Sequence, residues 1–205
     1  MDKFLALSEK KQKTIINAAL QCFGKFGYEK ASINDIAVAA HISKASVFQY
    51  FGSKKQLYMF LLEYCKKLIT EIFDKTALDA ESDLFDRILA SSRMETVSLK
   101  KQPFIIPFIT SVCEEKSPEV SGILTVMLDE VGKYRDALVL RKRDTLKFKN
   151  PADAEPVFKM LLLMAEGYAA RYRNEEVFDF DTVMDEFEKN IAVLRNNFYK
   201  EEYLL

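Results

Sequence analysis

The sequence predicts an all-α protein of about nine helices. Apolar side chains recur every three or four residues along most of the chain, which is the period of an amphipathic helix. Glycine and proline, which often interrupt helices, occur only six and five times among 205 residues. No segment shows the sustained alternation of apolar and polar residues that is typical of a half-buried strand. These observations favour a helical bundle over a sheet.

The first part of the chain predicts three helices. One covers residues 9–26 and ends at Gly27, because glycine readily adopts the conformation that terminates a helix. A second, short helix follows the N-cap Ser32. Residues 41–42 then form the turn to a third helix, whose N-cap is Ser43. Two short helices joined by a tight turn predict a helix-turn-helix.

The rest of the chain predicts a helical bundle. A helix over residues 54–74 connects it to the first part, and the acidic stretch 79–83 is expected to be a connector. Further helices are expected over residues 84–99, 103–115, 118–143, 151–173 and 181–199. We therefore expect a helix-turn-helix domain over residues 1–53 and a second domain over residues 54–205.

The third helix is expected to have two different sides. Val47 and Phe51 are four residues apart, so they point together into a small core. The opposite side then carries Lys44, Ala45, Phe48 and Gln49. An exposed phenylalanine is unusual on a surface that meets only water, although packing of Phe48 against a neighbouring helix is the alternative.

These outward side chains suit the base edges in the major groove of DNA. Gln49 can form two hydrogen bonds with adenine, and Ala45 and Phe48 can contact thymine methyl groups. Lys44 can reach guanine or a phosphate. The side of the third helix that faces away from the core therefore predicts a DNA-reading surface.

Hydroxyl and amino groups around this helix suit contacts with the DNA backbone. Lys54 and Lys55 begin a helix, where backbone N–H groups favour an anion, and Ser32 begins another. Ser46 and Tyr50 carry hydroxyl groups at the edge of the third helix. The complete set of predicted DNA-binding residues is Ser32, Ser43, Lys44, Ala45, Ser46, Phe48, Gln49, Tyr50, Lys54 and Lys55.

Charge is distributed unevenly along the chain. Residues 1–55 contain nine lysines and four acidic residues, a net charge of +5, whereas the rest of the chain carries −6. A positive first part and a negative second part indicate that only the first part binds a polyanion. A solvated lysine-rich surface is the alternative explanation.

The ordered series of residues over 9–65 resembles the DNA-binding domain of the TetR (tetracycline repressor) family of bacterial regulators. It includes Phe23-Gly24, Gly27-Tyr28, Asp35-Ile36-Ala37, Ile42-Ser43-Lys44 and the run from Phe48 to Lys54. The resemblance implies an all-helical homodimer whose second domain binds a ligand and dimerises. It also implies DNA contacts by Ser32, Lys44, Ser46, Gln49, Tyr50 and Lys54. His41 stands where relatives usually have glycine, and histidine tolerates the positive φ of such a turn.

The second domain contains two sets of candidate functional residues. Aromatic and methionine side chains can line an adaptable apolar pocket, although each is also an ordinary core residue. The predicted ligand-binding residues are Phe85, Ile88, Phe104, Phe108, Met127, Val131, Tyr134, Met160 and Met164. Apolar stripes on the last two helices predict a four-helix dimer interface, with an internal core as the alternative. Its predicted residues are Phe158, Leu162, Ala165, Ala169, Phe187, Ile191, Leu194 and Phe198.

The sequence thus predicts a transcriptional regulator. We expect a cytoplasmic repressor that binds a palindromic DNA operator as a homodimer and is released by a small hydrophobic or amphipathic effector. The alternative is a helical ligand-binding or adaptor protein without DNA binding. With a single histidine, no glycine-rich phosphate loop and no metal-ligand spacing, we expect no enzyme, no metal and no cofactor. No membrane span is expected, and the three cysteines are expected to be buried, inert thiols.

Overall fold

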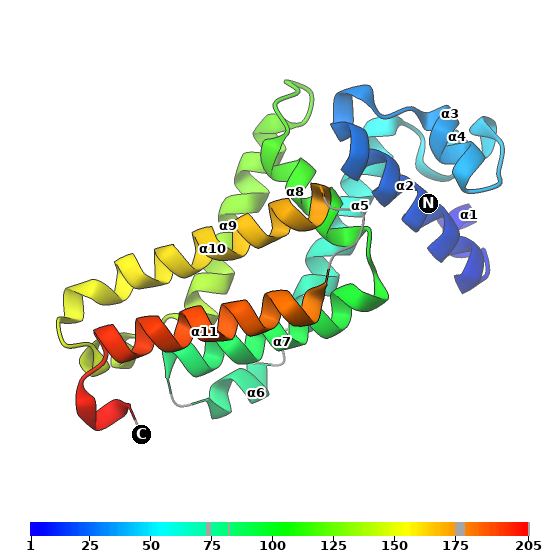
Figure 1. Cartoon of the computed structure of the whole chain (residues 1–205). Helices are drawn as coiled ribbons and strands as arrows, with labels where there is room; N and C mark the ends of the chain where they lie inside the picture. Colours follow the sequence, from blue (N-terminus) through cyan, green and yellow to red (C-terminus); the bar gives the residue numbers. More distant parts are fainter. Residues whose placement is uncertain (73–74, 82, 175–178, 205) are drawn as a thin grey trace. The chain divides into compact units, whose positions relative to one another are not determined.

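The computed structural model describes residues 1–72, 75–81, 83–174 and 179–204, and it confirms the all-α prediction (Figure 1). Among these residues, nine α-helices have seven residues or more, and no strand is present. One isolated antiparallel bridge joins Phe148 and Tyr199.

The chain forms two compact units, and each contains segments that are far apart in the sequence. The first unit comprises residues 1–70 and 102–129, and the second comprises residues 71–101 and 130–205. This division differs from the predicted one at residues 53 and 54, because residues 54–70 and 102–129 pack together with the first 53 residues.

The first unit contains the predicted helix-turn-helix. Its helices are α1 (Asp2–Leu5), α2 (Glu9–Lys30), α3 (Ile33–Ala39), α4 (Lys44–Phe51), α5 (Lys54–Ile72), α8 (Ile105–Glu114) and the beginning of α9 (Ser121–Val139). The short α1 was not predicted, since four residues give too little periodicity. Gly27 interrupts α2 as expected, with φ 69° and ψ 176°, but helical residues continue beyond it to Lys30.

A close contact between α2 and α8 organises the core of the first unit. A Cβ atom on Gly24 would lie 2.9 Å from the backbone nitrogen of Phe108 and 3.0 Å from the carbonyl carbon of Pro107. Glycine is therefore the residue that lets these two helices approach. Beside this contact, the ring of Tyr58 packs edge-on against Phe23 and Phe108, with centroids 5.0 and 5.4 Å away.

The second unit is a bundle in which α11 packs against both α7 and α10 (Figure 1). Its elements are α6 (Lys75–Ala80), α7 (Leu84–Lys101), the end of α9, α10 (Ala154–Asn174), α11 (Phe180–Phe198), and the 3-10 helices η1 (Lys142–Lys147), η2 (Pro151–Asp153) and η3 (Glu201–Tyr203). The predicted connector is shorter than expected, because residues 79 and 80 belong to α6. The helix predicted over residues 118–143 ends at Val139 and is followed by η1.

A buried ion pair lies inside the second unit. The guanidinium of Arg87 pairs with the carboxylate of Asp144, and both side chains have no exposed surface. Arg87 also donates from Nε to the carbonyl of Val139 at 3.0 Å, and Asp144 accepts from the backbone nitrogen of Arg141 at 2.9 Å. These hydrogen bonds offset part of the cost of removing both charges from water, and the other Asp144 oxygen, Oδ1, is buried without a hydrogen-bond partner among the described residues. The sequence pattern did not predict this pair.

Candidate nucleic-acid interface

The turn between α3 and α4 has the predicted local structure. The Ser32 hydroxyl accepts hydrogen bonds from the backbone nitrogens of Asn34 and Asp35, at 3.2 and 3.4 Å, and so begins α3. His41 adopts φ 55°, and it is the one non-glycine residue with positive φ in the described part of the chain. Ser43 then accepts from the backbone nitrogen of Ser46 at 3.0 Å and caps α4.

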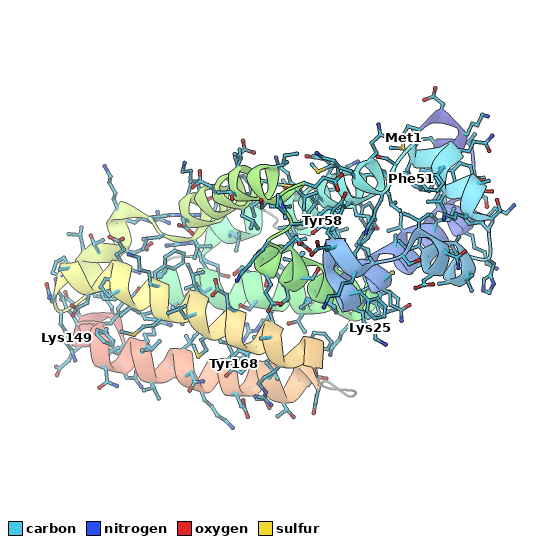
Figure 2. All side chains as sticks on the ribbon, turned by 90° about the horizontal axis from the view of Figure 1, so that it is seen from above. Met1, Lys25, Phe51, Tyr58, Lys149 and Tyr168 are labelled. Atoms are coloured by element: carbon cyan, nitrogen blue, oxygen red, sulfur yellow. The ribbon has the colours of Figure 1, made fainter. Side chains whose placement is uncertain are left out.

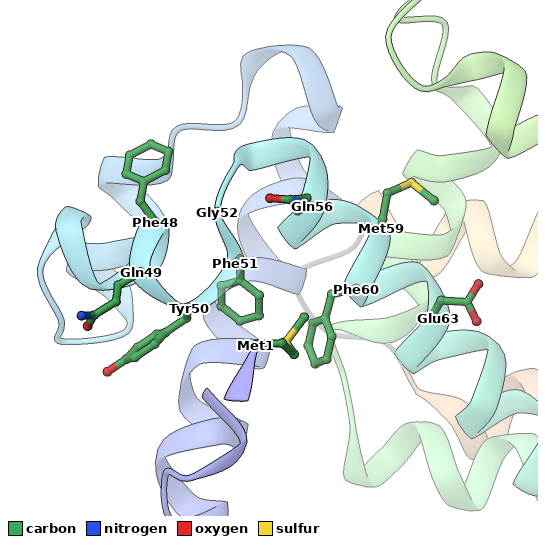
Figure 3. Close-up of a pocket in the computed structure, with 10 residues that line it drawn as sticks. All are labelled: Met1, Phe48, Gln49, Tyr50, Phe51, Gly52, Gln56, Met59, Phe60 and Glu63. Atoms are coloured by element: carbon green, nitrogen blue, oxygen red, sulfur yellow. The ribbon is translucent and has the colours of Figure 1, made fainter. Parts of the chain in front are cut away.

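The two sides of α4 are arranged as the sequence predicted. Val47 and Phe51 are buried, with 1% and 4% of their surface exposed. Phe48 is 41% exposed, which excludes the alternative that a neighbouring helix of this chain covers it. Lys44, Ala45 and Gln49 are also exposed. Figure 3 shows Phe51 directed toward Met1 and Phe60, whereas Phe48 and Gln49 point away from them.

The hydroxyl-bearing side chains at α4 make contacts within the chain. The Ser43 and Ser46 hydroxyl oxygens lie 2.8 Å apart, so these two side chains share a hydrogen bond at the start of the helix. Tyr50 is half-buried, and its ring lies 6.3 Å from that of Phe4. The three side chains remain at the surface of α4, where a serine or tyrosine hydroxyl can also bond a phosphate oxygen.

Lys54 makes two contacts within the chain that the sequence did not predict. Its ammonium donates to the carbonyl of Glu29 at 3.0 Å and lies 4.9 Å from the centre of the Tyr28 ring. A lysine ammonium has three hydrogens, so one carbonyl leaves further donor capacity for a phosphate. Lys55 is half-buried in the first turn of α5. The Ser53 hydroxyl accepts from the backbone nitrogen of Gln56 at 3.1 Å, which fixes the beginning of this helix.

Glu115 stabilises the end of α2, a contact that sequence analysis missed. Its carboxylate accepts from the backbone nitrogen of Tyr28 at 2.6 Å, and from those of Lys116 and Ser117 at 3.0 and 2.8 Å. Burial, together with the nearby carboxylates of Glu119 and Glu115, raises the pKa of the Tyr28 hydroxyl above its ordinary value. Tyr28 therefore remains neutral beside Lys54. No local pattern signals a contact between residues 87 positions apart.

The cysteine thiols do not all match the prediction. Cys22 and Cys65 are buried as expected, and burial raises the pKa of the Cys65 thiol to about 12. Burial also raises the pKa of Cys22. Cys113, in contrast, is exposed. The first two thiols are therefore protonated and shielded near neutral pH, whereas the third is accessible.

The predicted ligand-binding residues are divided between the two units. Phe104, Phe108 and Met127 belong to the first unit, and the other six belong to the second. Phe85 and Phe108 are completely buried among other side chains, and Ile88 is 7% exposed, so these three are core residues. Val131 and Met164 are half-buried, whereas Tyr134 and Met160 are largely exposed. A hollow of about 570 Å³ lies elsewhere, beside α4, and its lining includes Met1, Phe48, Tyr50, Met59 and Phe60 (Figure 3).

The predicted dimer residues differ in how exposed they are in the single chain. Phe158, Phe187 and Ile191 are at most 5% exposed and belong to the core of the second unit. Leu162, Leu194 and Phe198 are half-buried and pack against that core, Ala169 is half-buried, and Ala165 is exposed. The internal-core alternative therefore holds for Phe158, Phe187 and Ile191, whereas the other five residues retain exposed surface. Among the described side chains of α10 and α11, the large apolar ones that are exposed are Met160, Leu163 and Val193.

The described residues also bear on metal binding and on membrane crossing. Within them, no three or more histidine, cysteine, aspartate or glutamate side chains are placed to hold a metal ion. None of the helices in this part of the chain combines the length and apolar character that crossing a bilayer requires.

Comparison with known proteins gives matches to bacterial regulators. Residues 15–59 match the family described as "Bacterial regulatory proteins, tetR family". An uncharacterised HTH-type transcriptional regulator, YuxN of Bacillus subtilis, is 39% identical over 56 residues, which are 27% of this chain and 19% of that protein. RutR of Escherichia coli K12, an HTH-type transcriptional regulator, is 42% identical over 52 residues, 25% of this chain and 24% of RutR. The matched segments thus cover less than a quarter of each of these two relatives.

Solved structures match over nearly the whole chain. A TetR family transcriptional regulator from Chloroflexus aurantiacus superposes with a TM-score of 0.70, at 20% identity, over 98% of this chain and 99% of that one. The regulator FadR from Bacillus subtilis, solved in complex with stearoyl-CoA, gives 0.66 at 13% identity, over 87% and 96%. At these identities the likeness shows the shared fold. The match thus places residues 15–59, which contain the helix-turn-helix, with the TetR-family regulatory proteins, and the solved structures show that the chain shares their fold.

Proposed function

We propose that this chain is a transcriptional regulator that binds double-stranded DNA through the exposed side of α4. The observation that carries this proposal is the arrangement of α4 itself. Val47 and Phe51 hold the helix against the core, while Lys44, Phe48 and Gln49 remain exposed on its other side. A helix of eight residues fits the major groove of B-form DNA, which is about 12 Å wide.

Each outward side chain has a defined chemical role in this proposal. The Gln49 amide both donates and accepts, so it can pair with N6 and N7 of adenine. Ala45 and Phe48 offer apolar contacts for thymine methyl groups, and Lys44 can donate to guanine or to a phosphate. These residues would read sequence, because only contacts with base edges distinguish one base pair from another.

Contacts with phosphates would orient α4 in the groove. Ser32, Ser43, Ser46, Tyr50, Lys54 and Lys55 are the proposed backbone-contacting residues. The net charge of +5 over residues 1–55 supports attraction to the polyanion. Lys54 would keep its contact with the Glu29 carbonyl and use its other hydrogens for a phosphate.

We further propose that the regulator acts as a homodimer on a palindromic operator. A two-fold dimer presents two copies of α4, which together bind a symmetric site better than one copy does. Met160, Leu163 and Val193 support α10 and α11 as the dimerisation helices, since they expose between 50% and 67% of their surface. Their burial by a second copy would remove this apolar surface from water.

The effector in this proposal is a hydrophobic or amphipathic small molecule that releases the DNA, so the regulator acts as a repressor. The fold shared with FadR, which was solved with stearoyl-CoA, supports a ligand of this chemical class. Release requires that the ligand bind more tightly to the conformation that does not bind DNA. The protein would act where the chromosome is, in the cytoplasm.

Selection of DNA from a random duplex pool tests this function. The full-length protein is expected to enrich duplexes that contain an inverted repeat, and fluorescence anisotropy should then show tighter binding to them than to shuffled duplexes. Affinity should fall steeply as salt is raised, because counterions are released when lysines neutralise phosphates. Absence of both enrichment and measurable duplex binding would contradict the proposal and favour a helical ligand-binding or adaptor protein.

A further inference from the structure

We infer that Phe4 is a positioning residue for α4, an inference that rests on the proposed DNA binding. Phe4 lies in α1, outside the residues 15–59 that match the family. It is 1% exposed, whereas its neighbour Leu5 on the same short helix is 59% exposed. The four-residue helix α1 lies against α4, and Phe4 is its one buried side chain, so Phe4 is the point at which α1 attaches.

Three rings from three helices form an aromatic cluster, which we define as Phe4, Phe51 and Phe60. The centroid of Phe4 lies 4.8 Å from that of Phe51 and 5.3 Å from that of Phe60. The centroids of Phe51 and Phe60 are also 5.3 Å apart. The cluster therefore connects α1, α4 and α5. Figures 2 and 3 show Met1 and Phe51 close together at this end of the unit.

Hydrogen bonds from α2 also hold the end of α1 in place. The Gln12 side-chain amide donates to the carbonyls of Leu5 and Leu7, at 3.2 and 2.9 Å. The Ala6 backbone nitrogen donates to the carbonyl of Asp2 at 3.0 Å and closes the helical turn. Phe4 thus extends from an anchored segment, so its ring can resist a displacement of α4.

The orientation of α4 depends on few contacts. Within this eight-residue helix only Val47 and Phe51 are buried, and a helix of this length is not stable without such packing. Phe51 lies in the last turn, next to Tyr50, whose ring is 6.3 Å from Phe4. Removing the Phe4 ring would leave that turn free to tilt, and Gln49 would tilt with it. Hydrogen bonds to base edges tolerate displacements of only about 0.5 Å, whereas contacts with phosphates tolerate more.

The inference predicts a loss of sequence discrimination rather than of DNA binding in general. For the full-length protein, dissociation constants are measured at fixed salt for the selected duplex and for a shuffled duplex of equal composition. The ratio that measures discrimination is the dissociation constant for the shuffled duplex divided by that for the selected duplex. In Phe4→Ala this ratio should fall by about tenfold, because one bidentate base contact contributes that much. Leu5→Ala is the matched control on the same helix. It should change the ratio by less than roughly twofold.

Circular dichroism and thermal melting establish whether each variant is folded. Phe4→Leu keeps most of the buried apolar volume and should fold, with a ratio between those of the wild type and Phe4→Ala. If Phe4→Ala does not fold, Phe4→Leu decides the test, and a wild-type ratio in that variant would overturn the inference. Equal weakening on both duplexes would also overturn it, because that result indicates only a smaller folded fraction. A wild type that binds no duplex would instead contradict the proposed function itself.

Discussion

Each side chain of α4 lies on the side of the helix that its spacing in the sequence predicts. Val47 and Phe51 were predicted to point inward, and both are buried. This side could be predicted because the N-cap Ser43 fixes where the helix begins, and four-residue spacing then fixes the direction of each side chain. The contact of Lys54 with Glu29 could not be predicted, since it depends on where α2 ends in space.

The positive φ of His41 gives a prediction about the turn. A β-branched residue in this conformation is strained, so His41→Val should lower the free energy of unfolding by about 1–2 kcal/mol. Urea denaturation followed by circular dichroism would measure the change. His41→Gly is the control, because glycine adopts positive φ without strain, and it should be within about 1 kcal/mol of the wild type. Equal stability of the valine variant and the wild type would contradict this account of the turn.

At the scale of elements, the sequence predicted which segments form helices better than it predicted which helices pack together. The helices over residues 84–99 and 181–199 are confirmed as α7 and α11, because each has a long, continuous apolar stripe. α1 and the 3-10 helices were missed, since three to six residues carry little periodic signal. The packing of α8 on α2 depends on contacts between distant residues, which periodicity does not reveal.

The approach of α2 to α8 gives a prediction about Gly24. The methyl group in Gly24→Ala would meet the backbone of Phe108 and Pro107, which cannot move aside as a side-chain end can. We expect the free energy of unfolding to fall by about 1–3 kcal/mol, as in other overpacked cores. Thermal or urea unfolding would measure this loss.

Gly122→Ala provides the matched control for Gly24→Ala. Gly122 lies in α9, and a Cβ atom there would meet no other atom within 4 Å. Alanine has a higher helix propensity than glycine, so the free energy of unfolding of this variant should be unchanged or higher by up to about 1 kcal/mol. If the two alanine variants were equally stable, the close contact between α2 and α8 would not be the reason for glycine at position 24.

At the scale of the whole molecule, composition and apolar periodicity predicted the helical class but not the set of residues at each surface. The predicted ligand pocket and dimer stripe were chosen by helical spacing, and spacing alone does not separate a chain's own core from a surface for another molecule. Phe158, Phe187 and Ile191 show this ambiguity, because each is buried within one chain. Leu163 and Val193, on the same helices, are exposed instead.

Dimerisation through α10 and α11 gives a prediction about Leu163. This side chain is 67% exposed in the single chain. Leu163→Glu would place an unpaired charge in the proposed interface and should raise the dimer dissociation constant by at least about tenfold. Sedimentation velocity over a range of protein concentrations would measure it.

Leu146→Glu is the control, since Leu146 in η1 is similarly exposed, at 64%, and lies outside α10 and α11. It should leave self-association unchanged. If both variants dissociate like the wild type, α10 and α11 are not the dimerisation helices.

The most direct test of DNA reading by α4 is the affinity of Gln49→Ala for the selected duplex. Gln49→Ala should weaken that binding by about ten- to a hundredfold while the slope of affinity against salt stays the same, because the phosphate contacts remain. Gln21→Ala, an exposed glutamine on α2, should bind like the wild type. Equal affinities of Gln49→Ala and Gln21→Ala, with one and the same preferred sequence, would contradict the account.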